Sequence, residues 1–196
     1  MTTHRYRSAA RTVLGLATLT ALVAGCSSPT EADQQAPTTS GTSTPTADVA
    51  AGPGEVVVSG DVRNPTTLTS DALRALPQHT RTAAFESSTG SQSHTYDGAA
   101  LFDIISAADP AVDMEVKNPL LAVAVAATGA DGYTATIAWG EMSPDFAATE
   151  ILVAHTEDGA PLDRPRLVAP GDIKGGRYVG DLIQLHVVDL APDADR

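Results

Sequence analysis

The only cysteine of the chain, Cys26, is the side chain whose chemistry is most sharply indicated. It follows Val23, Ala24 and Gly25, an aliphatic residue and two small ones that let a peptidase approach the backbone. The thiol of Cys26 can take a diacylglycerol, and cleavage before Cys26 would free an amine that can take a further acyl chain, such as palmitate. Two or more acyl chains give stable membrane anchoring. The pattern therefore predicts lipidation at Cys26.

The residues before Cys26 have the composition of a lipoprotein signal peptide. Arg5, Arg7 and Arg11 form a basic start, and residues 13–24 form an apolar run of twelve residues. A membrane-spanning helix needs about 20 residues, so the run has the length of an export signal. We expect residues 1–25 to be removed and the chain to reside in the cell envelope, lipid-anchored to the extracytoplasmic face of a bacterial membrane. The alternative is an ordinary secretory signal with Cys26 incidental.

A second candidate for chemistry is the glycine-rich run of Lys174, Gly175, Gly176 and Arg177. Backbone N–H groups at the start of a helix can bind an anion, and two cations flank these glycines. The run is therefore a candidate cofactor-binding or anion-binding segment. The alternative is a turn whose glycines are needed for positive φ.

Other residues that could do chemistry have no supporting pattern. The histidines after residue 26 lack the short spacings typical of metal sites, so no metal site is predicted; they are His79, His94, His155 and His186. Ser87 lacks the glycines of a nucleophile elbow, and no catalytic residue is predicted. The net charge of −12 disfavours nucleic acid and anionic headgroups as partners.

The composition divides the chain into a tether and one domain. Residues 26–54 hold the lipidated cysteine and a Ser/Thr/Pro-rich linker without aromatic residues, which is expected to be disordered. Residues 55–190 are expected to fold as a single domain, followed by a tail at 191–196. With one cysteine in the whole chain, this domain has no disulfide.

Hydrophobic periodicity and turn residues predict a mixed order of strands and short helices in the domain. Helices are expected at residues 67–76 and 99–108, and a loop or short helix at 140–148. Strands are expected at residues 56–62, 81–87, around 94–96, 120–127, 133–139, 151–155, 166–169 and 183–188. This order predicts the α+β class, with mixed, mostly antiparallel sheets.

Four segments in this order resemble the molybdopterin-binding domain of the sulfite oxidase family of oxidoreductases. They are Val58–Pro65 with Leu73–Pro77, then Tyr96–Ile105, then Ala130–Tyr133, and finally Pro165–Gly171 with Gly176–Val179. The resemblance implies the sulfite-oxidase-like fold and a molybdenum cofactor held by pterin sulfurs and one protein cysteine. It places Ser87 at the position of that lost metal ligand.

The resemblance also implies a degenerate cofactor site. Gly180 stands where many family members have a lysine, and Asp181 follows where a phosphate-bearing pterin favours positive charge. Exported molybdoenzymes usually cross the membrane folded, behind a twin-arginine signal, and Arg5-Tyr6-Arg7 is not one. No cofactor is therefore expected.

The sequence favours a non-catalytic binding or accessory module, for a small anionic or polar ligand or an envelope protein. The first alternative is a molybdopterin-dependent oxidoreductase in which Ser87 or a water-derived oxygen replaces the thiolate, since serine can ligate molybdenum. The second alternative is a structural or interaction lipoprotein of the envelope.

Overall fold

The structure is a computed structural model that describes residues 51–191 of the chain. The expected signal peptide, Cys26, most of the expected linker and nearly all of the expected tail lie outside the described residues. Within residues 51–191, no helix is both long enough and apolar enough to cross a membrane.

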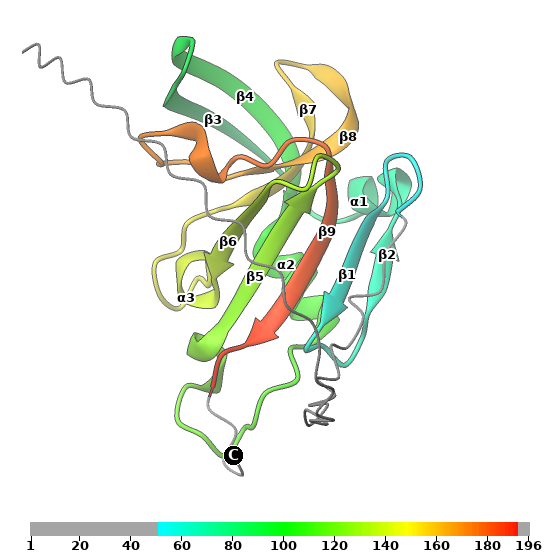
Figure 1. Ribbon diagram of the computed structural model, residues 1–196, viewed down its shortest axis with the longest axis vertical. Coiled ribbons are helices and arrows are strands. Elements are labelled where there is room, and N and C mark those ends of the chain that lie inside the picture. Colours follow the sequence, from blue (N-terminus) through cyan, green and yellow to red (C-terminus); the bar gives the residue numbers. More distant parts are fainter. Residues whose placement is uncertain (1–50, 192–196) are drawn as a thin grey trace, which may run out of the picture. The chain divides into compact units, whose positions relative to one another are not determined.

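Residues 51–191 form two β-sheets with short helices between their strands (Figure 1). The first sheet has the order β2-β1-β9-β5-β6, with bounds Thr66–Leu68, Val56–Gly60, Leu182–Asp189, Val123–Gly129 and Thr134–Ala138. The second has the order β3-β4-β7-β8, with bounds Gln78–Ser87, Gly90–Ala100, Leu152–Glu157 and Ala160–Val168. Only β1 and β9 pair in parallel among these strands, which confirms the predicted α+β class with mostly antiparallel sheets.

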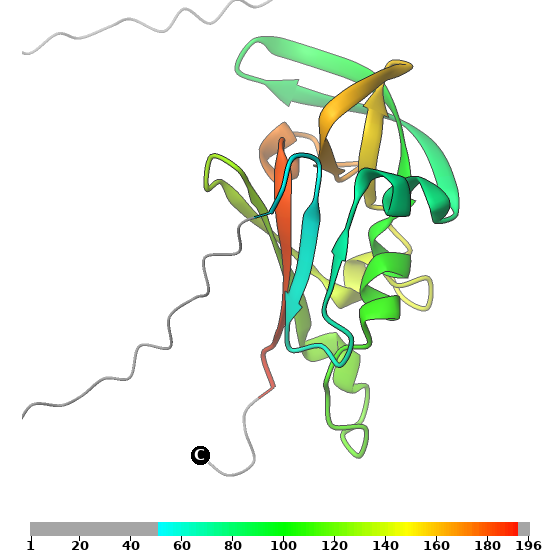
Figure 2. The same ribbon diagram turned by 90° about the vertical axis from the view of Figure 1, so that its right-hand side faces the viewer.

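Three short α-helices and two 3₁₀ turns complete the fold. They are α1 Ser70–Ala75, α2 Leu101–Ala108, α3 Trp139–Met142, η1 Pro119–Ala122 and η2 Gly175–Arg177. Thr69 caps α1 by accepting a hydrogen bond from the backbone N–H of Ala72 at 3.2 Å. Figure 2 shows α2 against one face of the five-stranded sheet, where Leu101, Ile104 and Ile105 are buried in the main core.

The β3–β4 hairpin is longer than predicted and positions the candidate site. It pairs without interruption from Gln78 with Ala99 to Ser87 with Gly90. The expected helix at 99–108 begins only at Leu101, because Ala99 and Ala100 continue β4 and pair with β7.

Other local predictions differ from the structure for equally specific reasons. Residues 120–122 belong to η1 after Pro119, so the strand expected at 120–127 begins at Val123. The helix expected at residues 67–76 begins only at Ser70, because Thr67 and Leu68 pair with β1 in the three-residue strand β2, which was not predicted. The alternation expected for residues 133–139 is present in β6, where Ala135 and Ile137 are buried.

A second, smaller core lies on the four-stranded sheet. Ala83, Tyr96, Leu152, Ala154 and Val168 are buried there, and the partly buried Tyr178 packs against them. Because Tyr178 directly follows η2, this core fixes the glycine-rich segment against the hairpin.

Candidate functional site

The ends of β3 and η2 form a hollow of about 540 Å³ that contains most of the predicted site residues. The backbone N–H of Glu86 donates to the carbonyl of Ile173 at 2.8 Å, and Glu86 pairs with Lys174 in a parallel bridge. The lining residues are Phe85, Glu86, Ser87, Ser88, Lys174, Gly175 and Gly176. The structure therefore brings Ser87 together with Lys174, Gly175 and Gly176.

The hydroxyl of Ser87 is engaged in the hairpin turn. It lies 2.9 Å from the carbonyl oxygen of Gly90, accepts from the backbone N–H of Thr89 at 3.2 Å and lies 2.9 Å from the Thr89 hydroxyl. The residue is exposed. These contacts are those of a turn-stabilising serine, and they compete with any role as a metal ligand.

Arg177, the fourth residue of the predicted segment, does not line the hollow. Its guanidinium donates to both carboxylate oxygens of Asp172, at 2.8 and 2.6 Å, and to the carboxylate of Glu141. These two partners, Asp172 foremost, raise the pKa of Arg177 above its ordinary value. The charge of Arg177 thus links η2 to α3.

The two glycines of η2 are not needed for positive φ. Neither Gly175 nor Gly176 has φ in that region, so the turn interpretation offered for the sequence is wrong on this point. Gly175 is required for a steric reason, because a Cβ there would lie 2.7 Å from Cδ2 of Phe85. A Cβ on Gly176 would meet nothing within 4 Å.

Phe85 packs between the glycine-rich turn and Tyr178. The ring centroids of Phe85 and Tyr178 are 4.4 Å apart, and those of Tyr96 and Tyr178 are 6.4 Å apart. The Tyr178 hydroxyl is buried and has no hydrogen-bond partner among the described residues. Burial raises the pKa of Tyr178 to about 12.

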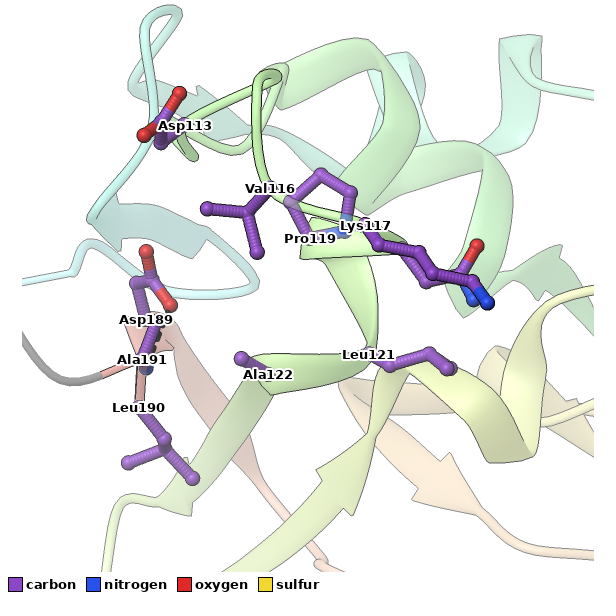
Figure 3. A pocket seen from close by; sticks show the side chains of 10 residues that line it. Asp113, Val116, Lys117, Pro119, Leu121, Ala122, Asp189, Leu190 and Ala191 are labelled. Carbon is purple, nitrogen blue, oxygen red and sulfur yellow. Dashed lines mark hydrogen bonds between the residues drawn. The ribbon is translucent and has the colours of Figure 1, made fainter.

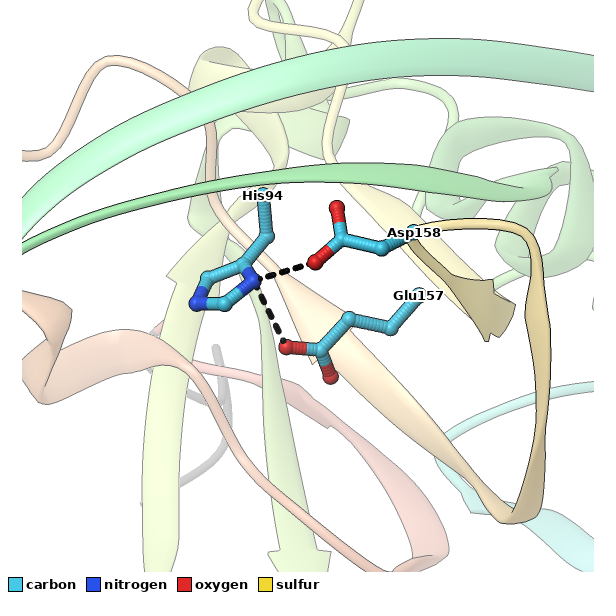
Figure 4. Close-up of side chains that lie close together, drawn as sticks. All are labelled: His94, Glu157 and Asp158. Atoms are coloured by element: carbon cyan, nitrogen blue, oxygen red, sulfur yellow. Dashed lines mark hydrogen bonds and ion pairs between the residues drawn. The ribbon is translucent and has the colours of Figure 1, made fainter.

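A cluster of titratable groups that the sequence did not predict lies beside these aromatic rings. His94, on β4, faces Glu157 at the end of β7 and Asp158 in the following turn (Figure 4). The ring centroids of His94 and Phe85 are 6.4 Å apart, so His94 lies near one residue that lines the hollow. His94 and Glu157 are 63 positions apart in the sequence, so no short spacing pattern connects the members of the cluster.

A larger hollow, of about 610 Å³, lies near the C-terminal end of β9 (Figure 3). Val116, Leu121 and Leu190 line it and are exposed to solvent. None of the predicted site residues lines this hollow. It is therefore a separate feature of the surface.

The cleft residues do not fit the molybdenum cofactor that the resemblance implies. Residues 51–191 contain no thiol, since Cys26 is the only cysteine. The Ser87 hydroxyl is occupied by its own turn, and Arg177 is occupied by two carboxylates. The Phe85 ring stands against Gly175, in the space beside the turn.

Comparisons with known proteins establish the relationship of the chain. No curated protein matches it. A solved structure that matches is the sulfane dehydrogenase SoxCD from Paracoccus pantotrophus, with a TM-score of 0.55 and 20% sequence identity. The match covers 69% of this chain and 38% of that chain, so this chain spans well under half of that protein. At this identity, the likeness shows the fold alone.

The family comparison covers most of the described domain. The model of the oxidoreductase molybdopterin binding domain matches residues 43–173. The matched range includes the β3–β4 hairpin and both strands that carry the His94 cluster. It ends just before Lys174, so η2 and β9 lie outside it. The resemblance noted in the sequence is thereby confirmed, and the chain belongs to the oxidoreductase molybdopterin-binding domain family.

Proposed function

We propose that this chain is an envelope lipoprotein whose molybdopterin-binding domain serves as a non-catalytic binding or accessory module. In this proposal residues 1–25 are removed on export, Cys26 carries the lipid, and the domain works on the extracytoplasmic face of a bacterial membrane. The basic start, the apolar run and the residues directly before Cys26 support this location, and the leader without a twin arginine supports export without a cofactor.

The observation that carries the proposal is the position of Phe85 in the cleft. Its ring lies against Gly175 and stacks near Tyr178, so the chain fills with its own side chains part of the space beside Ser87. A cofactor with a phosphate group also needs positive charge. Arg177 is held by Asp172 and Glu141, which leaves Lys174 as the cation that lines the hollow.

The remaining hollow suits a small anionic or polar ligand. Lys174 is exposed and makes no ion pair within residues 51–191, and the hydroxyl groups of Ser87 and Ser88 border the same space. Glu86 also lines it and receives a hydrogen bond from Ser91 at 2.5 Å. A ligand with one anionic group and one hydrogen-bond donor would complement Lys174 and Glu86.

Molybdenum analysis of the natively exported protein tests the proposal. We expect well under one tenth of a molybdenum atom per chain and no pterin fluorescence after denaturation. The Ser87→Cys variant, exported in the same cells, is expected to remain equally empty, because a restored thiol does not move Phe85. Stoichiometric molybdenum and pterin in the unmodified chain would overturn the proposal in favour of an oxidoreductase with a non-cysteine ligand.

The Ser87→Cys result separates two causes of an empty site. If this variant acquires stoichiometric molybdenum while the unmodified chain has none, the missing thiolate alone keeps the site empty. The role given to Phe85 is then wrong. A structural or interaction lipoprotein is the second candidate function, and the exposed apolar side chains around the hollow in Figure 3 favour it.

A further inference from the structure

His94, Glu157 and Asp158 are arranged like the ligands of a divalent metal ion. Each residue offers one ligand atom, and these atoms all lie within 4.8 Å of one another. The Nδ1 atom of His94 is 2.7 Å from Oδ2 of Asp158 and 3.3 Å from Oε1 of Glu157. Ligand atoms about 2.0–2.2 Å from a tetrahedral zinc ion are roughly 3.3–3.6 Å from one another. Small side-chain movements would therefore bring these three ligand atoms to the distances that zinc requires.

One nitrogen of His94 faces more acceptors than a single proton can satisfy. A neutral imidazole with its hydrogen on Nδ1 has one N–H to donate, but carboxylate oxygens of both Glu157 and Asp158 point at that atom (Figure 4). A metal ion between the three atoms would bind all of them at once. Two carboxylates with one imidazole form a donor set that suits zinc and similar first-row divalent ions.

The outer atoms of the three side chains are held in the way that metal ligands require. The second oxygen of Asp158 accepts from the backbone N–H of Thr95 at 2.8 Å, and the second oxygen of Glu157 accepts from Arg166 at 2.7 Å. A metal on Nδ1 leaves the proton of His94 on Nε2, which lies 3.4 Å from the side-chain oxygen of Gln92. Such contacts fix the tautomer and the orientation of a metal ligand.

The charged groups around the cluster leave it with a net negative charge, which favours a bound cation. Arg166 offsets one of the two carboxylates, and the hydroxyl of Tyr96 donates to Glu157 at 3.4 Å without adding charge. With a neutral His94 the cluster carries one net negative charge. Asp158 is 55% exposed, so an ion can reach the cluster from solvent.

We propose that His94, Glu157 and Asp158 form a site for one zinc-like divalent cation, with a further coordination position open to water or an external anion. The site joins β4 to the turn between β7 and β8. The cation site shares no residue with the proposed ligand hollow or with the lost molybdenum ligand. Presence or absence of zinc binding therefore does not decide the proposed function.

Zinc titration of the mature chain after treatment with chelator tests the site. We expect one equivalent to bind with a micromolar or tighter Kd. Zinc at a hundredfold excess over Kd should raise Tm by roughly 5–10 °C. Cobalt(II) should bind in competition with zinc and give visible bands without thiolate charge-transfer absorption, because the ligands are nitrogen and oxygen.

Variants assign the binding to these side chains. His94→Ala and Asp158→Asn should each weaken zinc binding at least tenfold. Asp158→Asn keeps an oxygen that can accept from the backbone N–H of Thr95, so it still tests the site if His94→Ala destabilises the protein. His186→Ala is the matched control, since that exposed histidine contacts Ser59 and not the cluster. Unchanged zinc affinity in Asp158→Asn, or no binding by the unmodified chain at 1 mM zinc, would overturn the proposal.

Discussion

At the residue scale, Tyr178 is an unusual member of the cleft, because its hydroxyl is buried without a hydrogen-bond partner among the described residues. A buried polar group in this state costs free energy that an apolar side chain of the same shape avoids. Its ring nevertheless packs against both Phe85 and the smaller core. Tyr178 therefore contributes through its ring, and its hydroxyl is dispensable for folding.

The first prediction concerns the pH dependence that this hydroxyl imposes. Burial raises the pKa of Tyr178 from 10.0 to about 12, so the unfolded chain binds fewer protons than the folded chain between these pH values. The free energy of unfolding must then fall as pH rises from 10 to 12. Tyr178→Phe should leave stability at pH 7 unchanged or slightly higher and flatten this decline. Urea unfolding at pH 7, 10 and 11 measures both effects.

Tyr96 supplies the comparison for that experiment. Burial also raises its pKa, but its hydroxyl donates to Glu157, so Tyr96→Phe should lower stability at pH 7 by about 1 kcal/mol. An alkaline decline as steep in Tyr178→Phe as in the unmodified chain would show that other groups cause it.

At the element scale, the contact between β3 and η2 depends on the absence of a side chain at one position. Gly175→Ala would place a methyl group 2.7 Å from the Phe85 ring, which must then move. Overpacking of this kind costs typically 1–3 kcal/mol. Gly176→Ala is the neighbouring control, because its methyl group would meet nothing within 4 Å, and it should change stability by less than about 1 kcal/mol. Urea unfolding of the two variants measures the difference.

A second variant makes the same prediction more stringent. Phe85→Ala removes the ring that the new methyl group would strike, so Gly175→Ala should cost less in that background than in the unmodified chain. The coupling between the two positions should amount to about 1 kcal/mol or more. Equal costs in both backgrounds would mean that Phe85 does not occupy the space beside η2.

Most elements follow from local sequence, and the exceptions depend on distant pairing. The alternation expected for residues 133–139 is a local signal, and β6 confirms it. The β-branched residues of β1 and the Thr69 cap of α1 are also local features of the sequence. The continuation of β4 through Gly98 is not local. A Cβ at Gly98 would lie 2.3 Å from the carbonyl oxygen of Val153, so this glycine serves the close approach of β7. No pattern within β4 reveals that contact.

The candidate site also contains residues that the sequence indicated and residues that only the pairing of distant strands brings together. Ser87 and the segment from Lys174 were singled out separately in the sequence, by the resemblance to a family and by the glycine-rich pattern, and the structure places them around one hollow. The His94 cluster was missed because it requires the register in which Tyr96 pairs with Glu157. That register depends on a bulge between Asp97 and Gly98, which hydrophobic periodicity cannot locate.

At the scale of the whole molecule, the acidic charge of the chain bears on how it stays at a membrane. The net charge of −12 gives a surface that anionic headgroups repel. In the proposed lipoprotein, the lipid on Cys26 supplies the attachment against this repulsion.

Cys26→Ser should therefore release the domain from the membrane without altering its fold. Acyl chains bind through their buried methylene groups, and without them nothing opposes the electrostatic repulsion. After ultracentrifugation of cell envelopes, the unmodified chain should sediment with membranes until detergent is added, while the variant should stay in the supernatant with the same Tm. Ser27→Ala, which keeps the thiol, is the control and should sediment. A Cys26→Ser chain that remains in the membrane pellet would require another attachment and would refute the proposed lipid anchor.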